Sequence, residues 1–451
     1  MAWVESKITT STLENPDVEL SKTTPPIQQN PSDDAAASEQ PVPITVGGNE
    51  AIPDGGWEGW RQVAAAHIVV AFSWGLINSF GFFQTYYTQL LGVSSSSVAW
   101  IGSIQIFLIF FVGVFSGSAF DAGHSLHLIV GSGALLNMLG IFMTSISKTS
   151  WQFMLSHGIC CGLSNGLMFT PSMAAVRTYF HKRKSLAMAL VLCGSGTGGM
   201  VIPAVLETNT QRIGFGWAVR IVGLLSAVLL PISCFVLRRR SQVKLATTFL
   251  SVKVLKELDY MLFNVAMFMN LMGLYFAYFF VPDLAQSRVG FSFDRAIDFL
   301  ILINGLGIPG RVGPMWLADK ISRPVDVLIP VNLVCAILTF ASIAIKDSAG
   351  VWAFVVLYGL FGAALIGLFP AGLANFSGDL SSAGSRIGWG FTIESFAILI
   401  GPPITGALLR GGSSDYWRAQ TFAGSCFSLG FIVLVTPRLL QSRSAGKLSE
   451  K

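Results

Sequence analysis

Twelve apolar runs constrain the fold of this chain more than any other feature, each of about the 20 residues that an α-helix needs to cross a bilayer. They centre near residues 61–83, 97–119, 127–146, 152–176, 185–206, 215–237, 259–282, 296–318, 326–345, 351–373, 386–409 and 417–437. Only 12% of the residues are charged, against about 25% in soluble domains. The sequence therefore predicts an all-α, multi-pass integral membrane protein.

The runs divide into two sets of six, which predicts six-helix halves at 56–237 and 259–437 joined by a cytoplasmic linker at 238–258. Residues 1–55 are rich in Ser, Thr, Pro and acidic residues. Such a segment buries too little apolar surface to offset its ordering entropy, so we expect a disordered cytoplasmic tail. Residues 438–451 are predicted to form a second cytoplasmic tail.

Positive charge sets the expected topology. With the amino terminus inside, the inner loops and the carboxyl tail hold 17 Lys and Arg residues, and the outer loops hold 7. Because basic loops stay in the cytoplasm, both termini are predicted to be cytoplasmic. We expect the plasma membrane to be the host membrane, with the vacuolar or another internal membrane as the alternative.

Composition also excludes several classes of function. The Cys residues all fall inside apolar runs, which indicates packing rather than a disulfide framework. Neither a zinc-like cluster nor a Walker or dinucleotide motif is present in the sequence, so no cofactor or metal is expected. The net charge of +5 is too small to indicate nucleic-acid binding. The expected partners are a small-molecule substrate and the lipid bilayer, with protons as a further candidate.

A basic cluster leads directly into a glycine-rich helix. Arg177, Lys182, Arg183 and Lys184 precede an apolar run that carries Gly194, Gly196, Gly198 and Gly199. The cations belong at the cytoplasmic end of the helix. The glycines predict that another helix or a substrate comes close to its backbone.

Several motifs together resemble one transporter family. Residues 54–60 resemble the signature DGGWGW, with Glu58 inserted before Gly59, and Tyr179–Pro203 resembles a second signature. Three further segments are similar to helices of the same family. Ile77–Tyr87 is similar to the end of the first helix, Gly310–Arg323 to the eighth helix and Ser385–Leu409 to the eleventh. The motifs are those of the monocarboxylate porter branch of the major facilitator superfamily, especially its fungal members.

This resemblance implies the major facilitator fold and transport by alternating access rather than an enzyme activity. The expected function is secondary active transport of an organic anion or small metabolite of monocarboxylate type. The first alternative is an efflux carrier for a fungal secondary metabolite made by a neighbouring gene cluster. The second is a nutrient sensor on a transporter scaffold. Residues expected to act in gating are Arg183, Gly194, Gly198, Asp121, Asp319 and Pro402.

An ionisable residue within a predicted membrane helix costs about 2.5–3.5 kcal/mol on insertion scales, so each one needs a reason, and Arg311 is the clearest case. The resemblance implies that Arg311 binds the carboxylate of a substrate; a fixed ion pair between helices is the alternative. Glu394 lies at a similar depth, so an internal pair with Arg311 is a further hypothesis. Glu394 and Asp298 are the candidates for proton coupling.

Two positions depart from the proton-coupled members of the family. Those members carry an acidic residue where this chain has Gly307, and a lysine where it has Asn78. Both differences weaken the case for simple symport of a monocarboxylate with a proton and suit a larger or less charged substrate. Besides Arg311, the residues expected to contact substrate are Asn78, Asn165, Tyr275, Tyr278 and Phe82.

Overall fold

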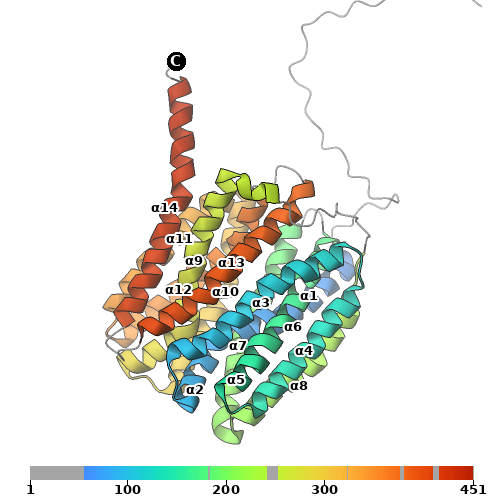
Figure 1. Ribbon diagram of the computed structural model, residues 1–451, viewed down its shortest axis with the longest axis vertical. Helices are drawn as coiled ribbons and strands as arrows, with labels where there is room; N and C mark the ends of the chain where they lie inside the picture. The colour runs from blue at the N-terminus through green and yellow to red at the C-terminus, as the bar shows by residue number, and fades with distance from the viewer. Residues whose placement is uncertain are drawn as a thin grey trace, which may run out of the picture. The chain divides into compact units, whose positions relative to one another are not determined.

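The computed structural model describes residues 55–180, 183–240, 252–321, 324–375, 380–409 and 416–449, and the elements in these ranges are all helices (Figure 1). Eleven of them are long and apolar enough to cross a membrane. A twelfth span follows if α1 and α2, which meet at 41°, are counted as one bent helix. The predicted all-α membrane architecture is thus confirmed. The predicted disorder of residues 1–55 falls, except for Gly55, outside the described residues.

Nine elements make up the first half of the chain. They are α1 (Gly56–Asn78), α2 (Phe80–Leu91), α3 (Ser95–Asp121), α4 (Leu126–Ile146), α5 (Ser150–Phe153), the π-helix η1 (Met154–Cys160), α6 (Cys161–Arg177), α7 (Lys184–Ile213) and α8 (Phe215–Val236). The first span bends at Ser79, and α5, η1 and α6 together form the fourth span.

The second half begins with a short 3-10 helix. Its elements are η2 (Val252–Lys256), α9 (Leu258–Leu284), the π-helix η3 (Ala285–Val289), α10 (Phe293–Ile321), α11 (Pro324–Ala341), η4 (Ser342–Ala344), α12 (Ser348–Asn375), α13 (Leu380–Leu408) and α14 (Tyr416–Ser449). The apolar span of α14 ends at Thr436. Its backbone stays helical to Ser449, through most of the segment that the sequence predicts as a tail.

Each half is a packed helical bundle. In the first half α1 lies against α7, and α4 lies against α6 and α8; in the second, α9 packs on α14, and α12 packs on α10 and α11. The halves meet mainly through three helix pairs, α3 with α13, α7 with α10, and α2 with α9 (Figure 1). Below, the inner side is the side on which α1 begins, and the outer side is the side on which α2 ends.

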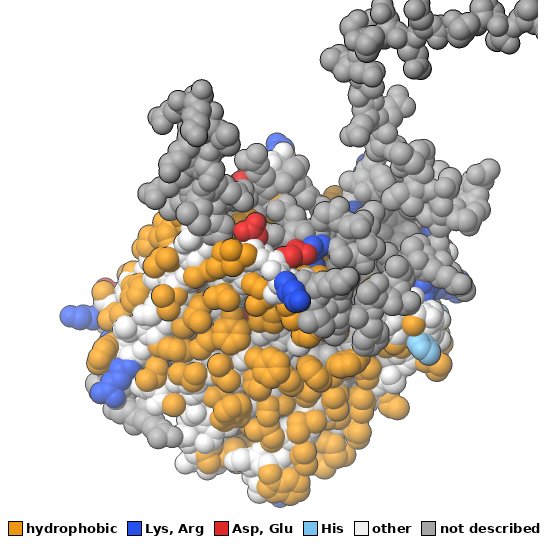
Figure 2. Space-filling model, turned by 45° about the horizontal axis from the view of Figure 1, so that its top comes forward, with side chains coloured by type: hydrophobic (Ala, Val, Ile, Leu, Met, Phe, Trp, Pro, Cys, Tyr) orange, Lys and Arg blue, Asp and Glu red, His pale blue; other side chains and the backbone are white. Residues whose placement is uncertain are grey.

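The outer surface of the bundle is strongly apolar. Figure 2 shows hydrophobic side chains spread over the body of the molecule, with charged side chains gathered near its upper end and margins. Large hydrophobic side chains are exposed on both halves, among them Leu128 at 75%, Phe235 at 76% and Ile432 at 58%. Such a surface would cause aggregation in water but matches the hydrocarbon of a bilayer.

Within the first half, glycines allow α7 to approach α1 very closely. A Cβ on Gly194 would collide with the carbonyl oxygen of His67, and one on Gly198 would collide with that of Ala71. The ring of His67 spans the same interface, with Nδ1 2.8 Å from the Leu190 carbonyl oxygen and Nε2 3.1 Å from the Thr197 hydroxyl. These contacts join α1 and α7 into one unit.

We expect Gly198→Ala to destabilise the protein because its methyl group would meet the backbone of Ala71, which cannot move aside as a side chain can. Overpacking of this kind costs about 1–3 kcal/mol. The measurement is the thermal unfolding midpoint in detergent. Gly313→Ala is the matched control, since a Cβ on this helical glycine meets no atom within 4 Å. Equal midpoints for the two variants would contradict the prediction.

Candidate substrate-binding site

The two halves are joined on the outer side by polar and aromatic contacts. The Ser96 hydroxyl of α3 donates to the Pro403 carbonyl of α13 at 2.9 Å. The Gln211 amide of α7 donates to Asp294 of α10 at 2.6 Å. The outer ends of the two bundles are therefore closed against each other.

Aromatic side chains continue this closure into the membrane. The ring of Phe82 lies 5.6 Å from that of Phe293, and the ring of Phe80 lies 4.7 Å from that of Phe279 across the α2–α9 contact. Phe82 is thus fully buried between the two halves, where its ring contacts α10. The structure places this predicted substrate residue away from Arg311, in the outer closure.

Deeper in the membrane, α7 meets α10 through a second pair of glycines. A Cβ on Gly199 would lie 2.5 Å from the amide of Asn304, and one on Gly196 would lie 2.8 Å from Ile308. Gly196 and Gly199 therefore face the other half, whereas Gly194 and Gly198, the two glycines that the sequence assigns to gating, face α1 in their own half.

Asn304 links the halves directly. Its Nδ2 donates to the Asn78 carbonyl oxygen at 3.3 Å and to the Leu300 carbonyl oxygen of its own helix at 2.9 Å. Sequence reasoning missed Asn304. The sequence did offer a signal for this residue. Asn304 is an amide on a predicted membrane helix, next to the glycine-rich segment that holds Arg311.

Ring contacts between the halves run from the outer side to the middle of the interface in the described part of the chain. Among ring contacts in the described part of the chain, the cross-half pair nearest the inner side is Phe110 with Phe391, at 5.0 Å between centroids. Both residues lie near the middle of their helices. The described contacts thus close the outer side of the interface.

Arg311 lies at the centre of this interface. It is 2% exposed, and its Nη1 donates to the Gly307 carbonyl oxygen at 3.1 Å. A Cβ on Gly196 of the opposite half would lie 3.5 Å from the same nitrogen. Tyr275 and Tyr278 lie within electrostatic reach of the guanidinium. Among the described residues, Arg311 has no carboxylate within ion-pair distance.

Several buried polar atoms near Arg311 lack hydrogen-bond partners. They are Oδ1 of Asn78, Oδ1 of Asn304 and the hydroxyl of Tyr278. Asn165 is also buried, with Nδ2 3.4 Å from the Ser73 carbonyl oxygen and Oδ1 unpartnered. Because an unpaired buried polar group costs about 1–3 kcal/mol, this centre is suited to a ligand that supplies hydrogen bonds.

Glu394 does not pair with Arg311, which corrects the hypothesis of an internal ion pair. The carboxyl group is fully buried in α13, and both of its oxygens lack a hydrogen-bond partner. Arg386, eight residues earlier, instead pairs with Glu257 at 2.6 Å. Asp298 lies exposed near the outer end of α10, within electrostatic reach of Glu207.

The remaining residues expected to act in gating lie near the helix ends. Asp121 ends α3 and lies within electrostatic reach of Arg177 and Arg239. Arg183 is exposed at the start of α7. Pro402 lies in the outer part of α13, which stays helical through it. The side chain of Asp319 lies outside the described residues.

The two signature segments touch each other at the inner side. The Gly55 amide donates to the Tyr179 carbonyl oxygen at 3.1 Å, and the rings of Trp60 and Phe180 lie 5.2 Å apart. Gly55 has φ +97°, a conformation that favours glycine. A Cβ there would lie 2.9 Å from the Phe180 ring. The first signature therefore anchors the start of α1 on the α6–α7 connection.

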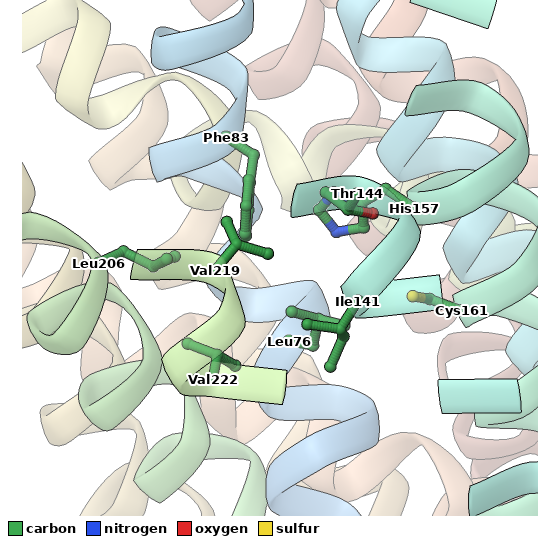
Figure 3. Close-up of a pocket in the computed structure, with 9 residues that line it drawn as sticks. All are labelled: Leu76, Phe83, Ile141, Thr144, His157, Cys161, Leu206, Val219 and Val222. Atoms are coloured by element: carbon green, nitrogen blue, oxygen red, sulfur yellow. The ribbon is translucent and has the colours of Figure 1, made fainter. Parts of the chain in front are cut away.

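A small pocket lies inside the first half, away from the interface (Figure 3). Apolar side chains surround the ring of His157 and the hydroxyl of Thr144. The pocket offers about 10 Å³ to water, about the room that one water molecule needs. His157 Nδ1 lies 3.1 Å from the Tyr87 hydroxyl, so the ring is a hydrogen-bonded packing residue. The pocket is too small for an organic substrate.

Two helical bundles that meet around a buried polar centre define the class of multi-pass membrane carriers. The family model described as Major Facilitator Superfamily matches residues 63–315, more than half of the 451 residues. The chain belongs to the major facilitator superfamily and is a secondary transporter.

The sequence relatives are fungal. The chain is 38% identical to an MFS-type transporter of Gibberella zeae over 86% of this chain and 88% of the relative. It is 34% identical to the aspyridones efflux protein apdF of Emericella nidulans over 88% of this chain and 81% of the relative. It is 31% identical to the MFS transporter asaE of Aspergillus flavus over 87% and 89% of the two chains.

Solved structures show the same fold. The peptide transporter POT bound to sulfate aligns with a TM-score of 0.67 at 15% identity, over 86% of this chain and 96% of that chain. The nucleoside transporter NupG aligns with a TM-score of 0.65 at 15% identity, over 83% and 99% of the two chains. These alignments confirm the predicted major facilitator fold.

We expect Gly307→Asp to neutralise the positive charge of Arg311 in the binding centre. A Cβ at this position would lie 2.9 Å from Arg311 Nη1, so the new carboxylate would pair with the guanidinium. Affinity for an anionic substrate should fall about tenfold or more, since a hydrogen bond to a charged group contributes about 1.5–3 kcal/mol. The measurement is substrate binding to the purified protein.

Two variants serve as comparisons for that measurement. Arg311→Gln should show the same loss of binding, because it removes the same charge. Arg61→Gln removes an exposed arginine that pairs with Glu58 on the surface of α1 and should bind normally. Full binding by Gly307→Asp would show that Arg311 does not hold the substrate.

Proposed function

We propose that this transporter exports a fungal secondary metabolite carrying an acidic group, from the inner side across the plasma membrane. The similarity to an efflux protein for aspyridones over most of both chains supports export of a secondary metabolite. The comparisons favour this alternative over the uptake of a simple monocarboxylate. The two signature segments, which contact each other at Gly55 and Tyr179, support membership of the monocarboxylate porter branch.

The observation that carries the substrate class is the isolated guanidinium of Arg311. A buried charge is normally paired, because desolvation strongly disfavours a lone ion. Here the described residues offer the guanidinium a carbonyl oxygen, nearby tyrosines and the thiol of Cys193, but no carboxylate. A carboxylate or another acidic group of a substrate would complete the hydrogen bonds of its planar fork.

The surroundings of Arg311 suit a substrate larger than a short-chain acid. Tyr275 and Tyr278 supply buried aromatic surface, and Asn78 and Asn304 supply unpaired amide oxygens on opposite halves of the protein. A substrate that accepts hydrogen bonds at its acidic group and donates them elsewhere would satisfy both kinds of atom. Binding at a surface shared by the halves also fits alternating access.

Deletion of the gene in its native host tests the proposed export. The expected result is that one metabolite accumulates in the cells and falls in the medium, measured by comparative mass spectrometry of both fractions. Re-expression of the wild-type protein should restore export, whereas Arg311→Gln at equal abundance should not. An unchanged distribution of all metabolites, or full restoration by Arg311→Gln, would refute the proposal.

A further inference from the structure

The carboxyl group of Glu394 is the most isolated ionisable group in the described part of the second half. The residue is 0% exposed, and neither carboxyl oxygen has a hydrogen-bond partner. Its nearest charged neighbour along the chain, Arg386, is occupied by Glu257 at 2.6 Å and 2.7 Å. An ionised carboxylate with neither a counter-ion nor a donor is strongly disfavoured in such a place.

The helices packed on α13 offer few groups that could neutralise this carboxyl. α13 contacts α3, α9, α12 and α14. α3 carries no charged residue before Asp121 at its inner end, and α12 carries no titratable residue between Gly359 and Leu373. α14 offers the thiol of Cys426 within the membrane. The titratable group facing Glu394 from α9 is Tyr260.

Tyr260 connects this buried region to the inner surface. Its hydroxyl donates to the Arg386 carbonyl oxygen at 2.7 Å and lies within electrostatic reach of Glu394. Arg386 in turn holds Glu257, whose side chain is 45% exposed. One turn further along α9, Asn264 adds a buried Oδ1 that also lacks a partner. Hydrogen-bonding groups thus lead from the inner surface toward Glu394.

We propose that Glu394 is a proton-binding site built into the second half, reached from the inner side past Tyr260 and separate from the substrate centre at Arg311. The proton is held on the Glu394 carboxyl in the conformation that is closed on the outer side. It leaves to water at the inner surface, where Glu257 and Arg386 lie, and Tyr260 acts as a positioning residue. No bond other than the O–H bond of the carboxyl is broken.

This proposal rests on the proposed export function, to which it adds a driving ion. In an exporter, a proton that enters from outside and is released inside would return the empty carrier to the inward-facing state. Because Glu394 and Arg311 lie on different helices and do not pair with each other, proton and substrate would act through the conformational equilibrium rather than compete for one group.

Infrared spectroscopy of the purified full-length protein tests the proton site without any substrate. The wild-type protein should show a protonated carboxylic acid band at neutral pH that Glu394→Gln lacks. The matched control is Glu207→Gln, which removes a half-buried acid on α7 and should retain the band. Tyr260→Phe should keep the band but slow its exchange with deuterium from the solvent. A wild-type spectrum with no band attributable to Glu394 would overturn the proposal.

A transport experiment tests the coupling. Proteoliposomes take up the metabolite identified by gene deletion, with a pH gradient imposed across the membrane. The gradient should accelerate transport by the wild type and by Glu207→Gln, but not by Glu394→Gln, which should still exchange metabolite at equilibrium. Unchanged acceleration in Glu394→Gln, or a requirement for sodium when choline replaces it, would overturn the coupling.

The infrared result separates this proposal from the proposed export function. A Glu394 band in a protein whose deletion changes no metabolite would refute export and leave the proton site standing. Loss of export on deletion, together with a wild-type spectrum that lacks the band, would refute the proton site alone.

Discussion

The close approach of backbones along α7 is the constraint on which the rest of the structure depends. On one face, Gly194 and Gly198 bring α1 against α7. On another face, Gly196 and Gly199 admit α10 of the opposite half. A helix in lipid gains little from burying apolar side chains against another helix, so close packing has to supply the attraction. One helix therefore holds its own half together and forms the surface on which the two halves meet.

The position of Arg311 follows from that packing. Because Gly196 has no side chain, the guanidinium can lie beside the α7 backbone, and because Gly307 has none, it can fold back onto its own helix. The charge is thereby held in a region of low dielectric, where its interaction with an anion is stronger than in water. The same feature makes the centre unfavourable when empty, which favours occupation by a ligand.

The architecture was predictable because its physical cause is local in the sequence. Runs of apolar residues with the length of a bilayer predict membrane helices wherever they occur. Arg311 and Glu394 were also identifiable, because an ionisable residue within such a run requires a reason. The first-helix motif and the sequence around Tyr179 indicated a resemblance to a transporter family. The structure shows that these two segments are in contact.

The neighbour that each helix face contacts was less predictable, because it depends on the rotation of the helix about its own axis. Four glycines within six residues of α7 leave several faces bare, so spacing alone did not show which of them meets the other half. Phe82 was expected near the substrate, yet the 41° bend at Ser79 directs α2 toward α10. The expected Arg311–Glu394 pair failed for the same reason, since similar depths do not put two side chains on facing surfaces.

Because Arg311 and Glu394 do not pair, the presence of glycine at position 307 has a physical consequence. An acid at that position would lie beside Arg311 and compete with any anionic substrate for the guanidinium. With glycine there, the guanidinium stays open to the substrate, and a proton has to be carried elsewhere if one is used. Glu394 is the buried carboxyl in the described second half that meets this need, because neither of its oxygens is engaged. Moving the acid from α10 to α13 would let one scaffold accept bulkier acidic metabolites while it still responds to a proton gradient.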